Sequence, residues 1–307
     1  MSKTAFLFAG QGAAYTGMGK DLCEQYKAAR MVFEAGSDIL GFDIARLCFE
    51  ADNDTLAQTG NTQPAIFTMS LASCAVLEEK GVRADCAAGF SLGEISALAA
   101  AGAVELEDGF RIIQARGACM QKAAERTSGA MYAILGLDSA RIQEVCEETA
   151  GYVLPVNYNS PAQTVIAGEE EPAQAAADAC LAAGAKRAVR LAVNAGFHSA
   201  LMAEAAEEFK RLIHTVSFTA PEIPVYSNMT GEPIQDFSDM PSYLARQIVS
   251  PVQWRKTVEH MAQAGVTRAI EHGPGKVLCG LVRKISPEIQ TANCDSSQNL
   301  TSLLEKM

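Results

Sequence analysis

The sequence lacks the features that mark membrane, secreted and metal-binding proteins. Among its 307 residues, no apolar run approaches the roughly 20 residues of a membrane-spanning helix. The apolar part of the N-terminal segment, residues 5–9, is too short for a signal peptide. None of the nine cysteines forms Cys-x-x-Cys or stands in metal spacing with a histidine. We therefore expect a cytoplasmic protein with reduced, mostly buried thiols, no metal site and no membrane partner.

Basic residues are also scarce. The chain has 25 Lys and Arg against 36 Asp and Glu, which gives a net charge of −11. This balance argues against a nucleic-acid partner, and an acidic protein partner would have to meet a local basic patch. Otherwise the composition is ordinary for a globular protein, with 49% hydrophobic and 20% charged residues. The length allows one large domain, or a large domain with a small one.

The stretch that organises the chain is Gly-Phe-Ser-Leu-Gly at residues 89–93. A short apolar run precedes it and a helix-like run, residues 95–101, follows it, which is the strand–turn–helix order of a nucleophile elbow. The flanking glycines allow a sharp turn beneath Ser91, and the new helix directs its first N–H groups toward the site. The N–H of Leu92 would then face an oxyanion. The alternative is a plain Ser-Gly turn between a strand and a helix.

A second glycine-rich turn, Gly-Gln-Gly at residues 10–12, follows the first predicted strand, residues 3–8. It is not a phosphate loop, because Met-Gly at residues 18–19 stands where that motif needs Lys-Ser/Thr. A dinucleotide-binding motif is excluded as well, because Tyr15 occupies its last glycine position. Either this is a plain turn, or it contacts a ligand at a strand end, as loops of open α/β sheets commonly do.

Two long helices are predicted around the elbow. The first starts at residues 61–64, with Thr62 as candidate N-cap and a proline in the first turn, and ends near Gly81. The second covers residues 105–125, with Arg116 at the edge of its apolar stripe. A cation among apolar neighbours needs an anionic partner, because an unpaired buried charge is costly. That partner is either a structural carboxylate or the carboxylate of a substrate.

After residue 128 the pattern changes to short strands and helices in the order β-α-β-β-α-β. The strands are predicted at residues 131–135, 153–158, 164–167 and 186–193, and the helices at residues 139–149 and 172–183. This order is typical of a ferredoxin-like unit. We therefore expect an α/β protein in which a small domain, residues 129–194, interrupts a large domain formed by residues 1–128 and 195–307.

His198 is the strongest candidate for a general base among the four histidines. It lies at a loop-to-helix junction directly after the predicted small domain, and a cleft between two domains is a preferred place for a site. His214 and His260 are expected at the surface, because each lies on a charged helix or at its end. His272 is expected near the loop that begins at residue 273.

Together, these residues resemble the malonyl-CoA:acyl-carrier-protein transacylases of bacterial fatty-acid synthesis and the acyltransferase domains of polyketide synthases. The resemblance covers nearly the whole chain. The motifs that carry it are Phe-Ala-Gly-Gln-Gly (8–12), Gln-Pro-Ala (63–65), Gly-Phe-Ser-Leu-Gly-Glu (89–94), Gln-Ala-Arg-Gly (114–117), Asn-Ser-Pro (159–161), Phe-His-Ser (197–199), Gln247 with Pro-Val-Gln-Trp (251–254), and Gly-Pro-Gly-Lys (273–276).

The resemblance implies an α/β-hydrolase-like large domain with the ferredoxin-like insert, and an active site between them. It implies that Ser91 is the nucleophile and His198 the base. The backbone N–H groups of Gln11 and Leu92 would form the oxyanion hole. Arg116 would bind the free carboxylate of a malonyl group.

The resemblance also implies the remaining parts of the site. A backbone carbonyl near Gln247 would orient the histidine in place of an aspartate, and the sequence has no obvious third acid. Gln63, Asn159 and Phe197 would contact the substrate, and the bulk of Phe197 should disfavour a branched methylmalonyl group. The implied substrate is malonyl-CoA, a coenzyme A thioester, with no permanently bound cofactor. The implied partner is an acyl carrier protein, whose pantetheine thiol accepts the malonyl group.

The sequence departs from the common family pattern at three places. Phe90 stands where His is usual, Ala-Ala at residues 13–14 replaces Ser-Gln, and His272 stands where an aliphatic residue is usual. The first two changes remove polar groups beside the expected pocket. They affect the finer hydrogen-bond scheme and leave the implied roles of Ser91 and His198 unchanged.

Three other functions fit part of the pattern. A discrete acyltransferase of a polyketide assembly line is not separated from the fatty-acid enzyme by sequence. A serine esterase or thioesterase would share the elbow, but would normally place Asp or Glu before a C-terminal His and would not need Arg116. A non-catalytic binding module would have no need of an intact Ser91, His198 and Arg116.

Docking of a carrier protein is expected at a basic patch, because carrier proteins are acidic. One candidate patch consists of Lys186, Arg187 and Arg190 on the last strand of the predicted small domain. The other consists of Arg283 and Lys284.

Overall fold

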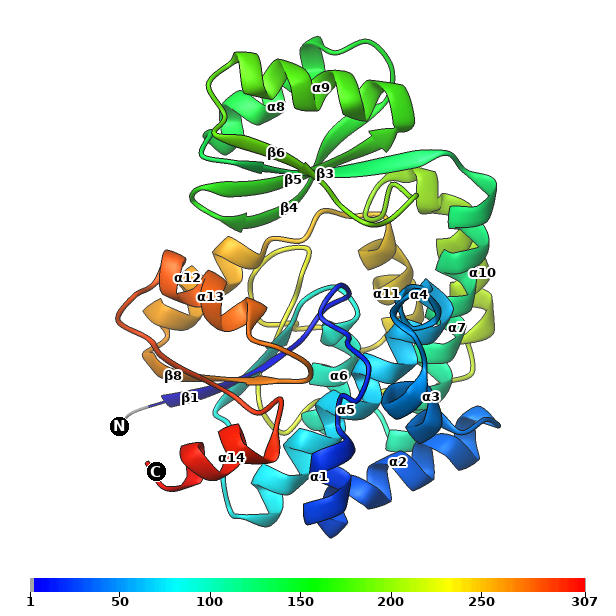
Figure 1. The fold of residues 1–307 in the computed structure, drawn as a ribbon, viewed down its shortest axis with the longest axis vertical. Helices are drawn as coiled ribbons and strands as arrows, with labels where there is room; N and C mark the ends of the chain where they lie inside the picture. The colour runs from blue at the N-terminus through cyan, green and yellow to red at the C-terminus, as the bar shows by residue number, and fades with distance from the viewer. Residues whose placement is uncertain (1–2, 307) are drawn as a thin grey trace.

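The computed structural model describes residues 3–306 and contains two sheets, one above the other (Figure 1). The lower sheet has the order β7-β2-β1-β8-β9 and is parallel. Its strands are β1 (Lys3–Phe8), β2 (Cys86–Gly89), β7 (Val225–Tyr226), β8 (Val266–His272) and β9 (Gln290–Asn293). The upper sheet has the order β4-β5-β3-β6 and is antiparallel. Its strands are β3 (Gly129–Leu135), β4 (Val153–Ser160), β5 (Gln163–Glu169) and β6 (Arg187–Arg190).

Helices surround the parallel sheet and cover the upper face of the antiparallel one (Figure 1). The helices before the antiparallel sheet are α1 (Lys20–Gln25), α2 (Lys27–Leu40), α3 (Ile44–Glu50), α4 (Asn53–Ala57), α5 (Thr59–Glu79), α6 (Gly93–Ala100) and α7 (Leu106–Arg126). The remaining ones are α8 (Ser139–Glu148), α9 (Glu170–Ala182), the 3-10 turn Ala200–Met202, α10 (Ala203–Leu212), α11 (Met240–Ile248), α12 (Trp254–Gln263), α13 (Val277–Ile285) and α14 (Ser297–Leu304). Within residues 3–306, none of these helices combines the length and apolarity that a membrane span requires.

Strand β1 shows why the parallel sheet is buried on both faces. Successive side chains of a strand point to opposite faces, so an apolar strand fills two cores at once. Phe6 and Phe8 belong to the core that α5 and α7 share. Ala5 and Leu7 belong to the core on the other face, with Trp254 of α12. Because these strands run parallel, the C-terminal ends of β1, β2, β7 and β8 lie at the same end of the sheet. Sites of open α/β folds form at that end.

The antiparallel sheet divides its side chains in the same way. Tyr132 and Ile134 of β3 pack beneath α8 and α9 in a core of their own. Met131 and Ala133, on the opposite face, join the main core of the lower part. The strand order confirms the ferredoxin-like arrangement within an α/β fold. The boundaries of the two domains stay a prediction, and residues 1, 2 and 307 of the large one lie outside the described residues.

The prediction for the start of α5 was wrong by about one turn. The helix begins at Thr59, and Thr62 lies inside it rather than at its cap. The N–H of Thr59 donates to Oε1 of Gln121 on α7, at 2.8 Å, so a neighbouring helix satisfies the first turn. The N–H of Thr62 donates to the Gln58 carbonyl at 2.8 Å. A cap that comes from 62 residues away leaves no local pattern in the sequence.

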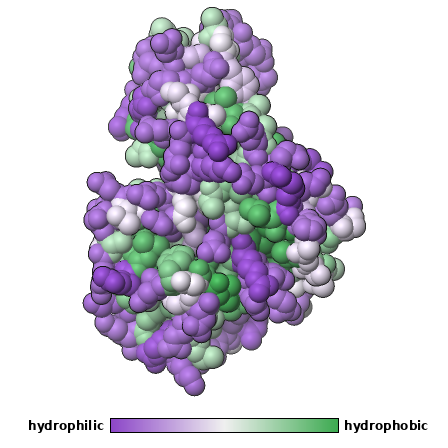
Figure 2. Space-filling model, turned by 90° about the vertical axis from the view of Figure 1, so that its right-hand side faces the viewer, coloured by the Kyte–Doolittle hydropathy of each residue, from purple (hydrophilic) through white to green (hydrophobic). Residues whose placement is uncertain are grey.

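Other expectations held in part. All nine cysteines are buried, as predicted, and His214 is exposed. His260 is half-buried rather than at the surface, because its Nδ1 bonds the Gly231 carbonyl at 2.8 Å. Strand β6 ends at Arg190, three residues earlier than predicted. On the face that Figure 2 shows, hydrophilic residues dominate the upper part, whereas hydrophobic residues lie among hydrophilic ones in the lower part.

Candidate active site

The turn after β2 has the geometry of a nucleophile elbow. Ser91 has a φ of +54°, a conformation that non-glycine residues rarely adopt. The turn is possible because its neighbours lack side chains. A Cβ on Gly89 would lie 1.9 Å from the carbonyl carbon of Gly93, and one on Gly93 would lie 2.2 Å from the Phe8 oxygen. Helix α6 begins two residues after the serine, and its first N–H groups are bonded into the turn. The N–H of Gly93 donates to the Phe90 carbonyl at 2.9 Å, and that of Glu94 donates to the Ser91 carbonyl at 3.2 Å.

The side chains of Ser91 and His198 meet directly. Ser91 Oγ lies 2.7 Å from Nε2 of His198. The Nδ1 atom of His198 lies 3.1 Å from the carbonyl oxygens of both Gln247 and Ser250, so Nδ1 carries the proton and Nε2 is left as an acceptor. Burial, and next the charge of Arg116, lower the pKa of His198 to about 4. The imidazole is therefore neutral at pH 7 and can accept the serine proton.

The backbone of His198 is as unusual as that of the serine. Its φ is +61°, and Ser91 and His198 are the two non-glycine residues with positive φ among residues 3–306. Strained residues persist only where the surrounding structure fixes them, and they cluster at functional sites. The loop is fixed on both sides, because Ser199 Oγ donates to the Gly196 carbonyl at 2.6 Å and the Ala200 N–H donates to the Tyr152 hydroxyl at 2.8 Å.

Two backbone N–H groups beside the elbow are free to receive an oxyanion. In the described part of the chain, no protein group accepts a hydrogen bond from the N–H of Gln11 or of Leu92. Gln11 follows β1, the neighbour of β2, and a Cβ on Gly10 would lie 2.8 Å from the Phe90 oxygen. The loop after β1 therefore runs against the elbow. The side chain of Gln11 points elsewhere, with Nε2 donating to Thr59 Oγ1 at 3.2 Å.

Arg116 lies beside the nucleophile. Its NH2 group lies 3.2 Å from Ser91 Oγ and 3.1 Å from Oε1 of Gln247, and its NH1 group donates to Oε1 of Gln63 at 2.9 Å. The side chain is 1% exposed, and its Nε atom has no partner. Among residues 3–306, no carboxylate oxygen lies within 4.0 Å of its guanidinium. Burial lowers its pKa to about 10, so it keeps its charge at pH 7.

Arg116 is therefore a buried cation held by neutral groups. The sequence left open whether its partner is a structural carboxylate or a ligand. The charge of Glu94 partly opposes the effect of burial on the pKa of Arg116, without a direct ion pair between the two side chains in residues 3–306. An unpaired buried charge is costly, so this geometry favours an anionic ligand beside Ser91.

Asn159 and Phe197 are less directly connected to this group. Asn159 lies on β4 and is 8% exposed, with an Oδ1 atom that has no partner. Phe197 is buried in the main core immediately before His198. Neither side chain has a hydrogen bond to Ser91 or Arg116 in residues 3–306, and their contact with a substrate stays a prediction.

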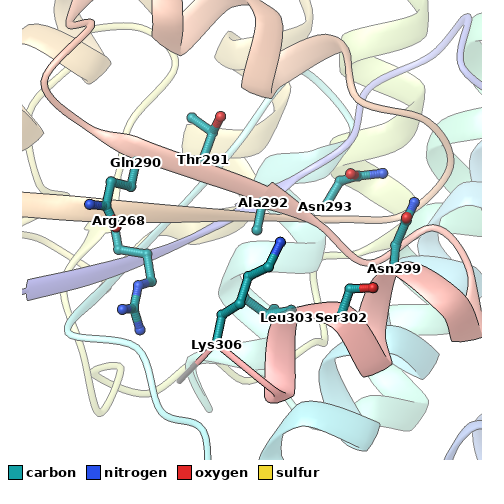
Figure 3. Close-up of a pocket in the computed structure, with 9 residues that line it drawn as sticks. All are labelled: Arg268, Gln290, Thr291, Ala292, Asn293, Asn299, Ser302, Leu303 and Lys306. Atoms are coloured by element: carbon teal, nitrogen blue, oxygen red, sulfur yellow. The ribbon is translucent and has the colours of Figure 1, made fainter.

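A separate polar pocket of about 310 Å³ lies at the edge of the parallel sheet (Figure 3). Residues of β8, β9 and α14 line it, among them Arg268 and Asn293, together with Lys306 just after α14. It contains none of the predicted site residues. Within the described range of the chain, no group of three His, Cys, Asp or Glu side chains could hold a metal ion.

Known proteins are similar to this chain in both sequence and fold. The sequence model of the family described as acyl transferase domain matches residues 5–292. The malonyl CoA-acyl carrier protein transacylase of Escherichia coli (strain K12) is 41% identical, over 99% of this chain and 100% of its own length. The chain belongs to the malonyl-CoA:acyl-carrier-protein transacylase family. The enzyme of the same name from Bacillus subtilis (strain 168) is 40% identical, over 95% of this chain and 93% of its own.

Solved structures of this transacylase family agree with the fold. The enzyme from Streptococcus pneumoniae matches with a TM-score of 0.95 and 41% identity, over 99% of this chain and 100% of that one. A malonyl-transacylase solved in complex with its type II polyketide acyl-carrier protein matches with a TM-score of 0.96 and 39% identity, and both chains are covered completely.

The structure shows what Phe90 and His272, two of the departures from the usual transacylase pattern, contact. The Phe90 ring packs edge-on against Trp254, with centroids 5.7 Å apart, so it replaces a polar group with an aromatic contact. His272 is fully buried at the end of β8. Its ring contacts the rings of Phe6 and Phe8, with centroids 4.5 and 5.2 Å away, and its Nδ1 lies 3.1 Å from Ser73 Oγ.

Two polar residues at this candidate site were not singled out from the sequence. Asn228 follows β7, and both its side chain and its N–H bond the elbow region. Glu94 is completely buried and accepts the N–H of Asn228. The available signal was the position of Asn228, two residues after a short strand, because parallel strands end at the same edge of a sheet.

Proposed function

We propose that this protein transfers the malonyl group from malonyl-CoA to the phosphopantetheine thiol of an acyl carrier protein. The single observation that carries the proposal is the convergence of Ser91 Oγ with His198 Nε2 at 2.7 Å and with the guanidinium of Arg116 at 3.2 Å. The first pair can form an acyl-enzyme. The guanidinium supplies a partner for a second carboxyl group on the acyl chain.

The first half of the reaction loads the enzyme. Ser91 Oγ attacks the thioester carbonyl carbon while His198 Nε2 takes its proton. The N–H groups of Gln11 and Leu92 stabilise the negative oxygen of the tetrahedral intermediate, and losing one such donor typically costs about 100-fold in rate or more. The carbon–sulfur bond then breaks, and His198 returns the proton to the CoA thiolate. The malonyl group stays on Ser91 as an ester.

The second half repeats these steps with a different thiol. His198 takes the proton of the pantetheine thiol, and its sulfur attacks the malonyl ester. The collapse of the intermediate releases Ser91 Oγ, which recovers its proton from His198. Gln247 serves both reacting groups, because its carbonyl accepts from His198 Nδ1 and its side chain holds Arg116 and the Ser91 carbonyl, the latter at 2.8 Å.

The test is the intact mass of the protein after it is mixed with malonyl-CoA. We expect the mass of one malonyl group to be added to the natural chain and none to Ser91→Ala. Addition of an acyl carrier protein should remove the group and place it on the carrier. Release of free malonate as fast as transfer would favour an esterase, and failure to form a malonyl-enzyme would favour a binding module.

The carrier protein that accepts the malonyl group, and the surface that binds it, need separate tests. A relative of known structure is bound to a polyketide carrier, so both fatty-acid and polyketide carriers should be compared as acceptors. For docking, Lys186 and Arg187 are exposed, whereas Arg190 is paired with Glu170. Arg283, on the other candidate patch, is exposed and donates to Thr291 at 2.8 Å. Both docking patches and a cytoplasmic location stay predictions.

A further inference from the structure

Asn228 forms a clamp across the elbow. Its Oδ1 accepts the N–H of Ser91 at 2.7 Å, and its Nδ2 donates to the carbonyl of Gly89 at 2.6 Å. The two bonds hold the residues on either side of Phe90, where the chain turns. One carboxamide thereby satisfies a donor and an acceptor that the sharp turn removes from the regular sheet and helix pattern.

The backbone of Asn228 is itself held by a side chain of α6. The N–H of Asn228 donates to Oε2 of Glu94 at 2.5 Å, and both residues are at most 1% exposed. Glu94 lies on the first turn of α6, so the asparagine is bonded to the elbow at three points, on residues 89, 91 and 94. Burial raises the pKa of Glu94 to about 7, against the opposing effects of its bond to Asn228, of Tyr243 and of Arg116.

The reaction described above makes no use of Asn228, since its side chain bonds backbone atoms and not the reacting Oγ. Yet Ser91 sits at a φ of +54°, a conformation that costs on the order of 1–3 kcal/mol and relaxes unless its surroundings oppose it. Relaxation would move Oγ away from Nε2 of His198. We propose that Asn228 is a positioning residue that holds the strained elbow in its reactive conformation, with Glu94 as its anchor.

The proposal rests on the proposed function only for the choice of substrate. A fluorophosphonate probe reports the same geometry without malonyl-CoA, because Ser91 Oγ bonds the phosphorus, fluoride leaves and His198 takes the proton. We expect Asn228→Ala to lower the rate constants of both labelling and malonyl-enzyme formation by about 100-fold, the typical cost of misplacing a reacting group by about 1 Å. The KM for malonyl-CoA should change little, because Arg116 is untouched.

The matched control is Asn299→Ala. Asn299 is a half-buried asparagine on α14 that donates one side-chain hydrogen bond to Asp295, and it has no contact with the elbow. This variant should keep the labelling rate of the natural chain. Rates are expressed per folded molecule, with the folded fraction taken from thermal unfolding, so that a loss of stability alone does not count as a loss of positioning.

Asn228→Asp separates positioning from simple packing. A protonated aspartic acid has the shape of asparagine and can donate to the Gly89 carbonyl while it accepts from Ser91, whereas the ionised form has no donor. Burial raises the pKa of the substituted carboxyl, and so does Glu94 while it is ionised, so the protonated form becomes more common as pH falls. We expect the rate of this variant relative to the natural chain to rise from about pH 8 to about pH 5.5, a window in which His198, with a pKa of about 4, stays neutral.

The outcomes distinguish the two proposals. If the natural chain reacts with the probe but not with malonyl-CoA, the proposed function fails and the clamp can still be judged. If Asn228→Ala reacts with both at the rate of the natural chain per folded molecule, the clamp is wrong. A reduced rate for Asn228→Asp that does not recover at lower pH would also contradict it, because the isosteric acid should restore both bonds.

Discussion

Arg116 holds its charge where no carboxylate lies within reach of a hydrogen bond. Gln63 and Gln247 present amide oxygens to two of its nitrogen atoms, and Nε has no partner. Amide oxygens orient a guanidinium without neutralising it, so the side chain is positioned and its charge remains available. This is the arrangement that a pocket for a carboxylate-bearing acyl group requires, because the ligand supplies the missing charge.

At this residue we predict that Arg116→Ala changes the choice of substrate. Hydrogen bonds to charged groups contribute about 1.5–3 kcal/mol each, so losing them should reduce the preference for malonyl-CoA over acetyl-CoA by at least about tenfold. The measurement is kcat/KM for both thioesters. Arg111→Ala is the control, because Arg111 lies on the same helix but is exposed and paired with Glu107. An unchanged malonyl preference in Arg116→Ala would rule out this role.

The sequence indicated which residue types matter here, but not how they are held. The pentapeptide and the stripe of α7 were enough to select Ser91 and Arg116. The neutral partners of Arg116 could not be derived from the residues alone, because Gln63 and Gln247 come from two further helices. Asn228 was missed for the same reason, since its bonds join residues 137 and 139 positions apart.

At the scale of the element, β2, the turn and α6 form one unit. Its packing requires close contact between the backbones of β2, α6 and the neighbouring strand β1. The Cβ that Gly89 lacks would overlap Gly93, and the one that Gly93 lacks would overlap Phe8 of β1. The elbow is thus packed against its own helix and against the neighbouring strand. Backbone atoms cannot rotate away as a flexible side chain can, so this crowding has no cheap relief.

We therefore predict opposite effects for two glycine substitutions. Gly89→Ala should lower the free energy of unfolding by about 3 kcal/mol or more and abolish labelling of Ser91. Gly280→Ala, on α13, meets open space and should raise the free energy of unfolding by about 0.5–1 kcal/mol, because alanine favours a helix. Urea unfolding of both variants measures this. A Gly89→Ala protein as stable as the natural chain would mean that the elbow is less tightly packed than described.

Elements with a strong local pattern were predicted well, and the others were not. Strands β3 and β5 and helices α7, α8 and α9 came within a few residues of their predicted bounds, because their apolar periodicity is clear. Strand β9 and helices α11 and α14 were not predicted. Strand β9 is short and polar, Gln-Thr-Ala-Asn, and it forms because β8 offers a parallel edge in register. Such a strand is specified by its neighbour rather than by its own residues.

At the scale of the whole molecule, one hydrophobic core joins the two sheets. Met131 and Ala133 of β3 belong to the same cluster as Phe8 of β1. A bridge between Asn157 of β4 and Val252 also connects the upper sheet to the segment that follows Ser250. The carbonyl partners of His198, Gln247 and Ser250, lie a few residues before Val252. A shift of the upper sheet would therefore change the hydrogen bonds that orient the imidazole.

The same core contains an imidazole that plays no part in the proposed reaction. His272 is 0% exposed, its Nε2 has no partner, and burial lowers its pKa from 6.5 to about 3. The adjacent carboxylate, Glu271, does not compensate for a charge there, because it accepts the N–H groups of Leu278 and Cys279 at the start of α13. Protonation of His272 therefore requires the core to open.

This depressed pKa makes folding sensitive to acid. Below pH 6.5 the unfolded chain binds a proton that folded His272 refuses, so stability is fully present above the unfolded pKa and falls as the pH drops toward 3. Each pH unit in this range costs about 1.36 kcal/mol, which amounts to about 2 kcal/mol between pH 6.5 and about pH 5. His198, with its pKa lowered to about 4, adds to the loss in the same direction.

We predict that His272→Leu, which introduces the kind of aliphatic side chain that the family usually has there, removes its share of this loss. The measurement is the free energy of unfolding in urea at about pH 7 and at about pH 5, for both proteins. The loss between the two pH values should be about 2 kcal/mol smaller in the variant than in the natural chain. His214→Leu, which replaces an exposed imidazole, should leave the difference between the two pH values unchanged. If His272→Leu loses as much stability as the natural chain, the imidazole must already be reached by solvent in the folded state, and the acid sensitivity must come from other groups.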